Sequence, residues 1–163
     1  MAKATQTISL EHHEKLAKQN FNKTWDFLDK KDRTPEEDLE MIHTVHASRF
    51  HWGILVSEGK GTALNLQRGE WIISRVYTVL ERGEPALYHA KICLDLTEKN
   101  DIGDFDLAFA YEAMARSSAV VGNKKDFEKY YQLAEEAAEK IKKKDDRDYF
   151  LDELNGGKWF GLK

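Results

Sequence analysis

Residues 74–93 read SRVYTVLERGEPALYHAKIC, and residues 115–134 read ARSSAVVGNKKDFEKYYQLA. Aligned by their first residues, the two stretches carry small or aromatic side chains at the same successive steps of 3, 9, 4 and 3 residues. These positions are Ser74, Tyr77, Ala86, Ala90 and Cys93, and then Ala115, Ser118, Phe127, Tyr131 and Ala134. Small side chains let two helices cross closely, and aromatic rings fill the space that a crossing leaves open. The spacing therefore predicts two helix hairpins built on one plan.

Helical periodicity extends over the rest of the chain, where apolar residues recur about every three to four positions and do not alternate. The clearest start of a helix is Thr34-Pro35-Glu36-Glu37, because the threonine can cap, the proline fits the first turn and Glu37 can bond back to the cap. Gly122-Asn123 ends a later helix, since both residues tolerate the left-handed conformation. The seven expected helices cover about residues 9–28, 35–56, 62–82, 85–99, 107–121, 124–143 and 146–154. An all-α fold follows.

The second of these helices has apolar residues on two flanks. Leu39 and Phe50 lie on one flank, and Met41 and Val45 lie on the other. A helix that is apolar on two sides is usually packed between neighbours. We therefore expect both flanks to be buried.

The spacing of the two repeated stretches resembles the tetratricopeptide repeat (TPR). That repeat has a small residue and then a tyrosine in its first helix, and alanine, an aromatic residue and alanine in its second. Phe127 and Ser118 depart from this pattern, and the stretches lie 41 residues apart (115 minus 74), whereas the family repeats every 34. The extra residues fall in the acidic segment 100–106. The resemblance covers residues 66–142 and reaches the first helix pair by analogy; the whole chain also resembles a bacterial family of helical-repeat proteins for which no activity can be carried over.

This resemblance implies a right-handed array of antiparallel helix hairpins, with residues 1–163 as one TPR-like helical domain. In TPR arrays the first helix of each pair lines a concave groove that binds a protein or peptide partner. The matching positions of this chain are Arg68, Trp71, Arg75, Phe109, Glu112 and Arg116. Guanidinium groups and aromatic faces suit carboxylates, phosphates and peptide backbones, so the expected ligand is a peptide, a protein or a small acidic molecule. Charged ends of the arginines should then face solvent. The other interpretation is that Glu112 and Arg116 form an i,i+4 ion pair and that Trp71 belongs to the core.

A cluster of histidines in the second helix indicates an alternative function, a metal-dependent or hydrolytic enzyme. Glu40 and His43 form a Glu-x-x-His unit, and His46 lies one turn further on the same face. The unit occurs once, whereas a zinc site needs three or four ligands, so a further ligand would come from another helix. The candidates for that ligand are His12, His13 and His89. We favour the structural alternative, in which these histidines form hydrogen bonds between packed helices.

Composition narrows the possible functions further. The formal charge of −4 argues against a nucleic-acid partner, because such proteins normally carry a basic stripe. The single cysteine, Cys93, cannot form an internal disulfide and indicates a reducing compartment, so we expect a cytoplasmic protein. The polar opening, residues 1–9, and the lack of a long apolar run predict neither a signal peptide nor a membrane span. No motif indicates a cofactor, and Ser74, Ser117 and Ser118 lack the Gly-x-Ser-x-Gly elbow of a nucleophile.

An apolar tail, residues 155–163, closes the chain. Its segment Lys158-Trp159-Phe160-Gly161-Leu162-Lys163 follows the flexible pair Gly156-Gly157. Three large apolar side chains within four residues favour burial, at about 1.5–3 kcal/mol for each side chain. We expect them to fold back over the last helix pair of the same chain. The alternative is that they enter the groove of a second copy and form a homodimer.

Overall fold

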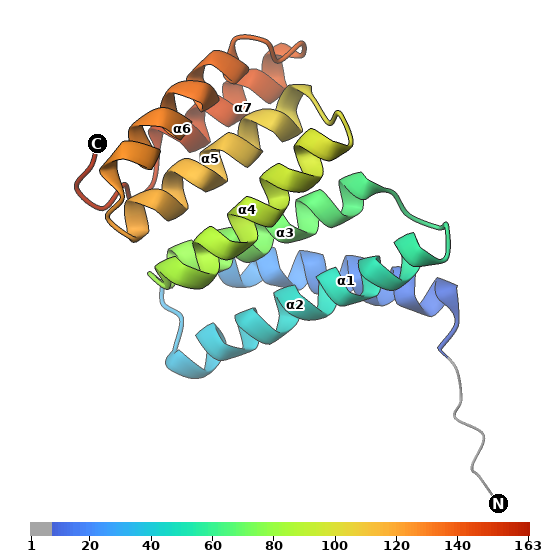
Figure 1. Cartoon of the computed structure of the whole chain (residues 1–163). Coiled ribbons are helices and arrows are strands. Elements are labelled where there is room, and N and C mark those ends of the chain that lie inside the picture. Colours follow the sequence, from blue (N-terminus) through green and yellow to red (C-terminus); the bar gives the residue numbers. More distant parts are fainter. Residues whose placement is uncertain (1–7) are drawn as a thin grey trace, which may run out of the picture.

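The structure is a computed structural model that describes residues 8–163, and these residues form seven α-helices and no β-strand. The helices are α1 (Leu10–Asp29), α2 (Pro35–Ser57), α3 (Ala63–Val79), α4 (Gly83–Lys99), α5 (Asp104–Val120), α6 (Lys124–Ala138) and α7 (Lys144–Asn155). The expected all-α fold is confirmed for this part of the chain (Figure 1). Most of the polar opening segment, residues 1–7, lies outside the described residues.

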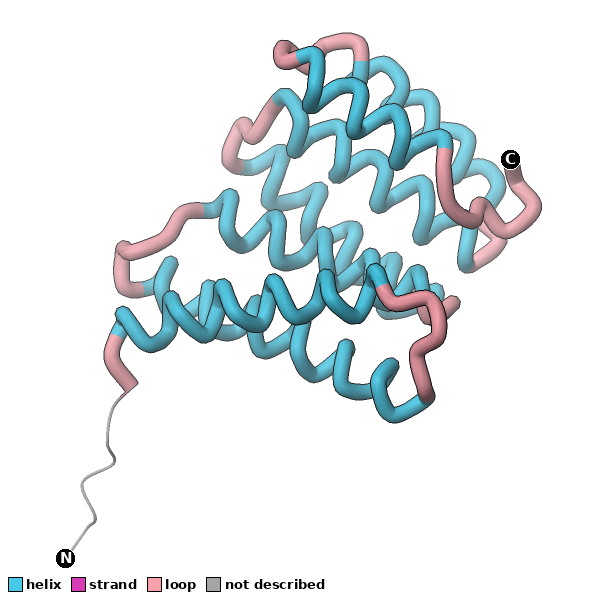
Figure 2. The backbone as a smooth tube through the Cα atoms, turned by 180° about the vertical axis from the view of Figure 1, so that it is seen from behind, coloured by secondary structure: helices cyan, strands magenta, loops and turns pink. Residues whose placement is uncertain are grey.

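Consecutive helices pack against each other as antiparallel pairs. The most extensive contacts join α1 to α2, α3 to α4 and α5 to α6, and further contacts join α2 to α3 and α4 to α5. The odd-numbered helices also meet, because α3 contacts α5 and α5 contacts α7. Figure 1 views the molecule from the side of α2 and α4, with α1 and α3 behind them, and Figure 2 shows the opposite side. We call α1, α3, α5 and α7 the odd layer.

Local side-chain signals set the starts of the first two helices. The Ser9 hydroxyl accepts a hydrogen bond from the backbone N–H of His12 at 3.2 Å and caps α1. In α2 the Thr34 hydroxyl accepts from the backbone N–H of Glu37 at 3.3 Å, and the Glu37 carboxylate accepts from the backbone N–H of Thr34 at 2.9 Å. The expected capping box is therefore confirmed.

The turn between α3 and α4 differs from the sequence expectation. Gly83 does not end α3, which ends at Val79, but is the first residue of α4. The left-handed residue of this turn is Glu81, with a φ of 56°. Gly83 is a glycine for a different reason, because a Cβ there would lie 2.6 Å from Cγ1 of Val121. Its lack of a side chain lets the start of α4 approach the end of α5 closely.

The small residues of the two repeated stretches lie at helix crossings, as their spacing predicts. Those that are fully or almost fully buried are Ser74, Ala86, Ala90, Cys93, Ala115, Ser118 and Ala134. At the α3–α4 crossing the Ser74 hydroxyl donates to the backbone carbonyl of Ala86 at 2.9 Å. Trp71 packs against all three clusters of buried apolar residues found in the described part of the chain. It therefore connects the cores of neighbouring helix pairs.

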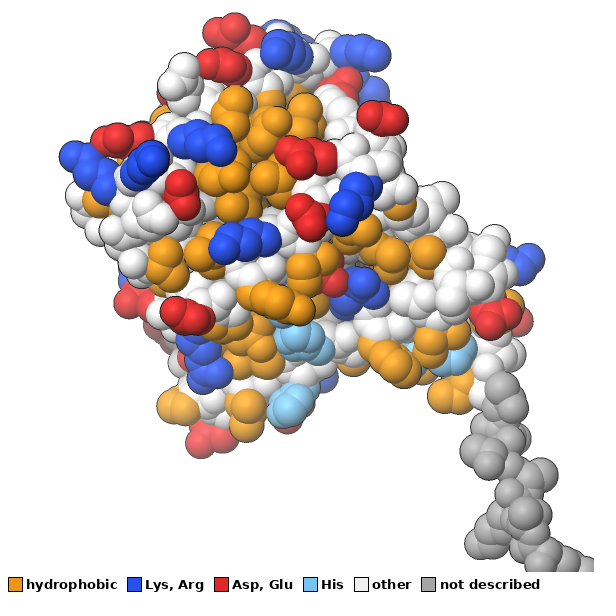
Figure 3. All heavy atoms as spheres, viewed as in Figure 1, with side chains coloured by type: hydrophobic (Ala, Val, Ile, Leu, Met, Phe, Trp, Pro, Cys, Tyr) orange, Lys and Arg blue, Asp and Glu red, His pale blue; other side chains and the backbone are white. Residues whose placement is uncertain are grey.

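One flank of α2 contradicts the expectation that both are buried. Met41 and Val45 are fully buried, but Leu39 and Phe50 are 51% and 62% exposed. Figure 3 shows hydrophobic and histidine side chains together on the surface around α2. The main contacts of α2 are with α1 and α3, and among residues 8–163 no helix covers the flank that carries Leu39 and Phe50.

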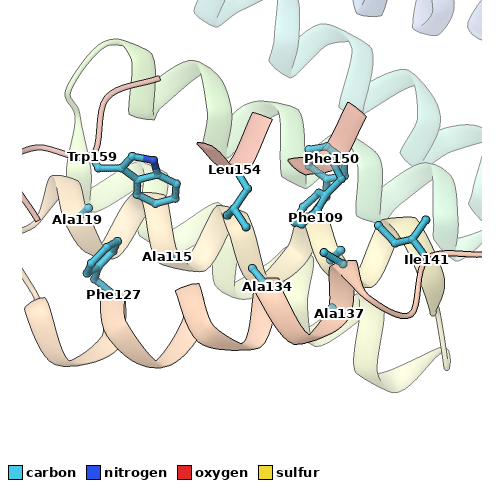
Figure 4. Packing of buried hydrophobic residues seen from close by; sticks show 12 residues of the cluster. Phe109, Ala115, Ala119, Phe127, Ala134, Ala137, Ile141, Phe150, Leu154 and Trp159 are labelled. Atoms are coloured by element: carbon cyan, nitrogen blue, oxygen red, sulfur yellow. The ribbon is translucent and has the colours of Figure 1, made fainter. Parts of the chain in front are cut away.

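Ala115 provides a test of the packing at the α5–α6 crossing. The residue is completely buried and lies between α5 and α6 near Ala134 (Figure 4). We expect Ala115→Leu to lower the free energy of unfolding by about 1–3 kcal/mol, because the added atoms overpack the crossing. Urea denaturation followed by circular dichroism measures this loss. A neutral result would mean that Ala115 does not lie at a close crossing.

The C-terminal tail folds back over α5 and α6 of its own chain. Trp159 is buried, with its ring centroid 5.5 Å from that of Phe127 and 5.1 Å from that of Tyr131 (Figure 4). The Lys163 ammonium donates to the backbone carbonyl of Leu154 at 3.4 Å. In this structure the tail therefore packs on its own chain, as the intramolecular arrangement predicts, and exchange with a second copy stays untested.

Candidate functional site

An aromatic pocket lies on the odd layer, where α1, α3, α5 and α7 meet. Its volume is about 220 Å³. The aromatic side chains that line it within residues 8–163 are Phe21, Trp25, Trp71, Phe105, Phe109 and Tyr149. Each of the four odd helices supplies at least one of these rings. The pocket therefore forms only when the odd helices are packed beside one another.

The rings of this pocket contact one another across helix boundaries. The ring centroids of Trp25 in α1 and Trp71 in α3 are 6.0 Å apart, and those of Trp71 and Phe109 in α5 are 5.2 Å apart. Phe105 of α5 stacks on Tyr149 of α7 with 6.2 Å between centroids. Aromatic pairs at about 4.5–7 Å attract each other beyond the area that they bury. The walls of the pocket are therefore held by their own packing.

Polar groups form the rim of the pocket. Arg68 donates from Nε and Nη2 to the two carboxylate oxygens of Asp106, at 2.7 and 3.0 Å, and this pairing raises the pKa of the guanidinium group. The Gln67 amide donates to the backbone carbonyl of Asp106 at 3.0 Å and to the Thr97 hydroxyl at 3.2 Å. Oε1 of Gln67 and Nε1 of Trp71 are buried without a hydrogen-bond partner among the described residues. Such unpaired polar atoms are rare in folded proteins, and here they belong to two residues that line the pocket.

The structure divides the six predicted groove residues into two groups. Those that line the aromatic pocket are Arg68, Trp71 and Phe109. The other three lie further along α3 and α5 and are joined by ion pairs; they are Arg75, Glu112 and Arg116. The expectation that the charged end of Arg116 faces solvent is wrong, because this residue is only 4% exposed.

Arg116 and Glu112 form a buried ion pair between α5 and the tail. The guanidinium group donates from Nε to the Glu112 carboxylate and from Nη2 to the backbone carbonyl of Glu153 at 2.7 Å. It also lies over the Trp159 ring, 4.0 Å from the centroid. Arg75 donates to Glu112 at 3.4 Å and to the Glu153 carboxylate at 2.7 Å. This geometry agrees with the structural interpretation of the Glu112–Arg116 spacing.

The histidines of α2 are divided between the surface and a helix interface. His43 is exposed. Nε2 of His46 lies 3.0 Å from the hydroxyl oxygen of Tyr77 in α3, and its ring centroid lies 5.4 Å from that of His89 in α4. His46 therefore forms a hydrogen bond between packed helices, as the structural alternative predicts.

A buried carboxylate, Glu70 of α3, connects α3 to both α2 and α4 near His46. Its Oε1 accepts from Nε of Arg49 in α2 at 2.7 Å, and its Oε2 lies 2.6 Å from Nδ1 of His89 in α4. Burial raises the pKa of Glu70, but the hydrogen bond to His89 and the charge of Arg49 outweigh this effect and hold the pKa below its ordinary value. The network pairs a charge that would otherwise be costly to bury.

Metal chemistry and thiol chemistry find little support in this geometry. Glu40, His43 and His46 do not form a ligand set, since no group of three His, Cys, Asp or Glu side chains in residues 8–163 is placed to hold a metal ion. His13 and His51 form a separate pair, with 2.7 Å between their Nδ1 atoms. Cys93 is buried at a crossing, and burial raises the pKa of its thiol, which disfavours the reactive thiolate.

The two perturbed histidines predict how stability depends on pH. Burial and the neighbouring His89 lower the pKa of His46, and burial and His13 lower the pKa of His51. A lowered pKa means that protonation favours the unfolded chain, so the stabilisation is present above the ordinary histidine pKa of about 6.5 and is lost as pH falls below it. We therefore expect the free energy of unfolding to fall between about pH 7.5 and pH 5.5. Urea denaturation at several pH values should show a smaller fall for His46→Gln. The exposed His12→Gln should keep the full dependence.

Comparison with models of known protein families, with curated protein sequences and with solved structures found no significant match for this chain. No helix in residues 8–163 combines the length and the apolar character that crossing a membrane requires.

Proposed function

We propose that this chain is a protein-interaction module with a TPR-like architecture, in which the odd layer is the binding face. The antiparallel pairs α1–α2, α3–α4 and α5–α6, followed by α7, support this architecture. A helical array alone does not define a function, because sites are built on folds of many kinds. The observation that carries the proposal is the aromatic pocket, to which all four odd helices contribute.

The partner is a peptide or protein segment that inserts one large apolar side chain into the aromatic pocket. Burying a leucine or phenylalanine there contributes about 1.5–3 kcal/mol. Tryptophan and tyrosine, which line the pocket as Trp25, Trp71 and Tyr149, are the residues that most often dominate binding energies. At the rim, Arg68 and Asp106 offer charged groups that can bind the peptide backbone. Because Arg68 and Asp106 neutralise each other's charge, the pocket favours an apolar side chain of the partner over an acidic one.

Selection of displayed peptides, with two tyrosine variants as a matched pair, tests the proposal. Tyr149 in the pocket wall is 48% exposed, and Tyr88 on α4 is 63% exposed. Peptides selected on the wild-type chain should share a large apolar residue. Tyr149→Ala should weaken their binding about tenfold, as expected for an aromatic anchor, whereas Tyr88→Ala should change it less than about twofold. Fluorescence of Trp25 and Trp71 provides the titration signal.

Equal effects of the two tyrosine variants would remove the aromatic pocket from the interaction. The same conclusion would follow if the selected peptides had no large apolar residue in common.

We also propose a reducing, cytoplasmic location for this module. The argument rests on its single cysteine, Cys93, which is buried and is not part of a disulfide. Modification of the protein by a membrane-impermeant thiol reagent after unfolding, but not before, would support a free and buried thiol.

A further inference from the structure

A second cavity lies beyond Trp71 along α3, beside the C-terminal tail. Its volume is about 280 Å³. Basic residues from four separate parts of the chain line it: Arg33 between α1 and α2, Arg75 of α3, Arg116 of α5 and Lys158 of the tail. Of the described residues in its wall, none is acidic. We call this cavity the basic pocket.

Hydrogen bonds to the end of α1 and to the start of α2 fix Arg33 in the basic pocket. Its Nη1 donates to the backbone carbonyls of Phe27 and Lys30 at 3.0 and 2.8 Å, and its Nε donates to the Asp38 carboxylate at 2.7 Å. The guanidinium group thereby also satisfies carbonyls at the end of α1. Within residues 8–163 its Nη2 takes part in no hydrogen bond. One donor of a rigid group therefore stays available.

Arg75, which also lines the cavity, is fixed in a similar way. Its Nη1 and Nη2 donate to Glu112 and Glu153, and in the described part of the chain its Nε has no hydrogen-bond partner. The carboxylates that hold Arg33 and Arg75 are not part of the cavity wall. An anion inside the basic pocket would therefore meet the cations, and not their carboxylate partners, at the cavity wall. Fixed donors also lose little conformational entropy when an anion binds.

The shape of the cavity distinguishes between kinds of anion. A phosphate monoester carries nearly two negative charges at neutral pH and has three strongly accepting oxygens, whereas a carboxylate has one charge and two coplanar oxygens. Basic side chains from separate parts of the cavity wall, Arg33, Arg75 and Lys158, suit the phosphate better. Val79 and Phe160 add apolar area to the same wall. That area can contact the organic group of an ester.

We propose that the basic pocket binds the phosphoryl group of a phosphate monoester. Arg33 and Arg75 donate to its oxygens, Lys158 closes over it from the tail, and the organic group lies against Val79 and Phe160. This site is separate from the aromatic pocket and does not depend on a peptide binding there.

Two lysine variants provide a matched test with inorganic phosphate and phenyl phosphate as probes. Lys158 and Lys144 have side chains that are 77% and 76% exposed, and each forms one surface ion pair, with Glu81 and Asp148. We expect saturable NMR shifts of the backbone amides around Arg75 and Lys158 at pH 7.5 and constant ionic strength. Lys158→Glu should weaken phosphate binding about tenfold, as expected for the loss of a charged donor, and Lys144→Glu should change it less than about twofold. Circular dichroism confirms that both variants fold.

Comparing the binding of phenyl phosphate, inorganic phosphate and acetate distinguishes the possible ligands. Tighter binding of phenyl phosphate than of inorganic phosphate supports the ester, and equal binding supports the phosphoryl site with free phosphate as its ligand. Acetate at the same concentration should cause much smaller shifts. Equal binding of acetate and phosphate would overturn the assignment. So would the absence of saturable shifts near Arg75, or an equal effect of Lys144→Glu and Lys158→Glu.

Discussion

Replacing Arg116 with alanine should lower the free energy of unfolding by about 3–5 kcal/mol, the range for breaking a buried ion pair on one side. The guanidinium group donates to the Glu112 carboxylate and to the backbone carbonyls of Glu153 and Gly156. Without it, Glu112 keeps a buried charge whose remaining partner is Arg75 at 3.4 Å. The carbonyl oxygens lose their donor as well, and unpaired buried polar groups are costly. Urea denaturation followed by circular dichroism measures the loss.

A surface pair of the same spacing serves as the control for Arg116. Lys124 and Glu128 also lie four positions apart on one helix, but their side chains are exposed to solvent. Lys124→Ala should cost less than about 0.5 kcal/mol, since exposed pairs contribute little. If Arg116→Ala cost no more than Lys124→Ala, the ion pair would be hydrated in solution and the tail would not cover it.

These two pairs also show what sequence reasoning can reach. The i,i+4 spacing predicts an ion pair both for Glu112–Arg116 and for Lys124–Glu128. We expect different energies for the two pairs because residues 153–159, about forty positions from Arg116, cover one pair and not the other. Nothing in the local pattern carries that information. Whether a charged pair is buried depends on tertiary packing.

Helix positions were predictable because their signals are local. The Thr34 capping box acts within a few positions of where it stands, and the small crossing residues such as Ser74 and Ala86 meet between helices that are adjacent in the sequence. Helix 35–56 was harder, since periodicity reports an apolar flank but not whether another element covers it. Leu39 and Phe50 illustrate this limit, because in the described part of the chain no helix covers them.

Only some of the residues that line the aromatic pocket could be predicted, for a related reason. Trp71 and Phe109 follow from the repeat register, and Phe21 and Trp25 lie four positions apart on the apolar face of the first helix. The sequence therefore indicates which helices carry these aromatic side chains, but not that the side chains meet in one pocket. The contribution of Tyr149 depends on how α7 docks on α5, which no repeat in the sequence specifies.

Removing residues 157–163 should lower the free energy of unfolding by about 3–5 kcal/mol, the amount expected for losing one buried tryptophan. The tail begins at Gly157, which passes close to Arg116. Gly157 has a φ of 73°, and a Cβ there would lie 2.7 Å from Nη1 of Arg116. It then inserts Trp159 against Phe127 and Tyr131. The deletion uncovers these rings and opens the Glu112–Arg116 pair to water. Trp159→Ala should reproduce most of the loss, because this ring is the buried part of the tail.

The mass of the truncated chain in solution decides between folding back and exchange. If the tail packs on its own chain, light scattering gives the same mass before and after truncation, and the shortened protein melts at a lower temperature. If the tail enters a second copy, the full-length chain is a dimer and truncation converts it to a monomer. In the second case the melting temperature of the full-length chain also rises with protein concentration, because association stabilises the folded state by mass action. An unchanged mass together with an unchanged melting temperature would contradict both arrangements, since a buried tryptophan cannot be removed without cost.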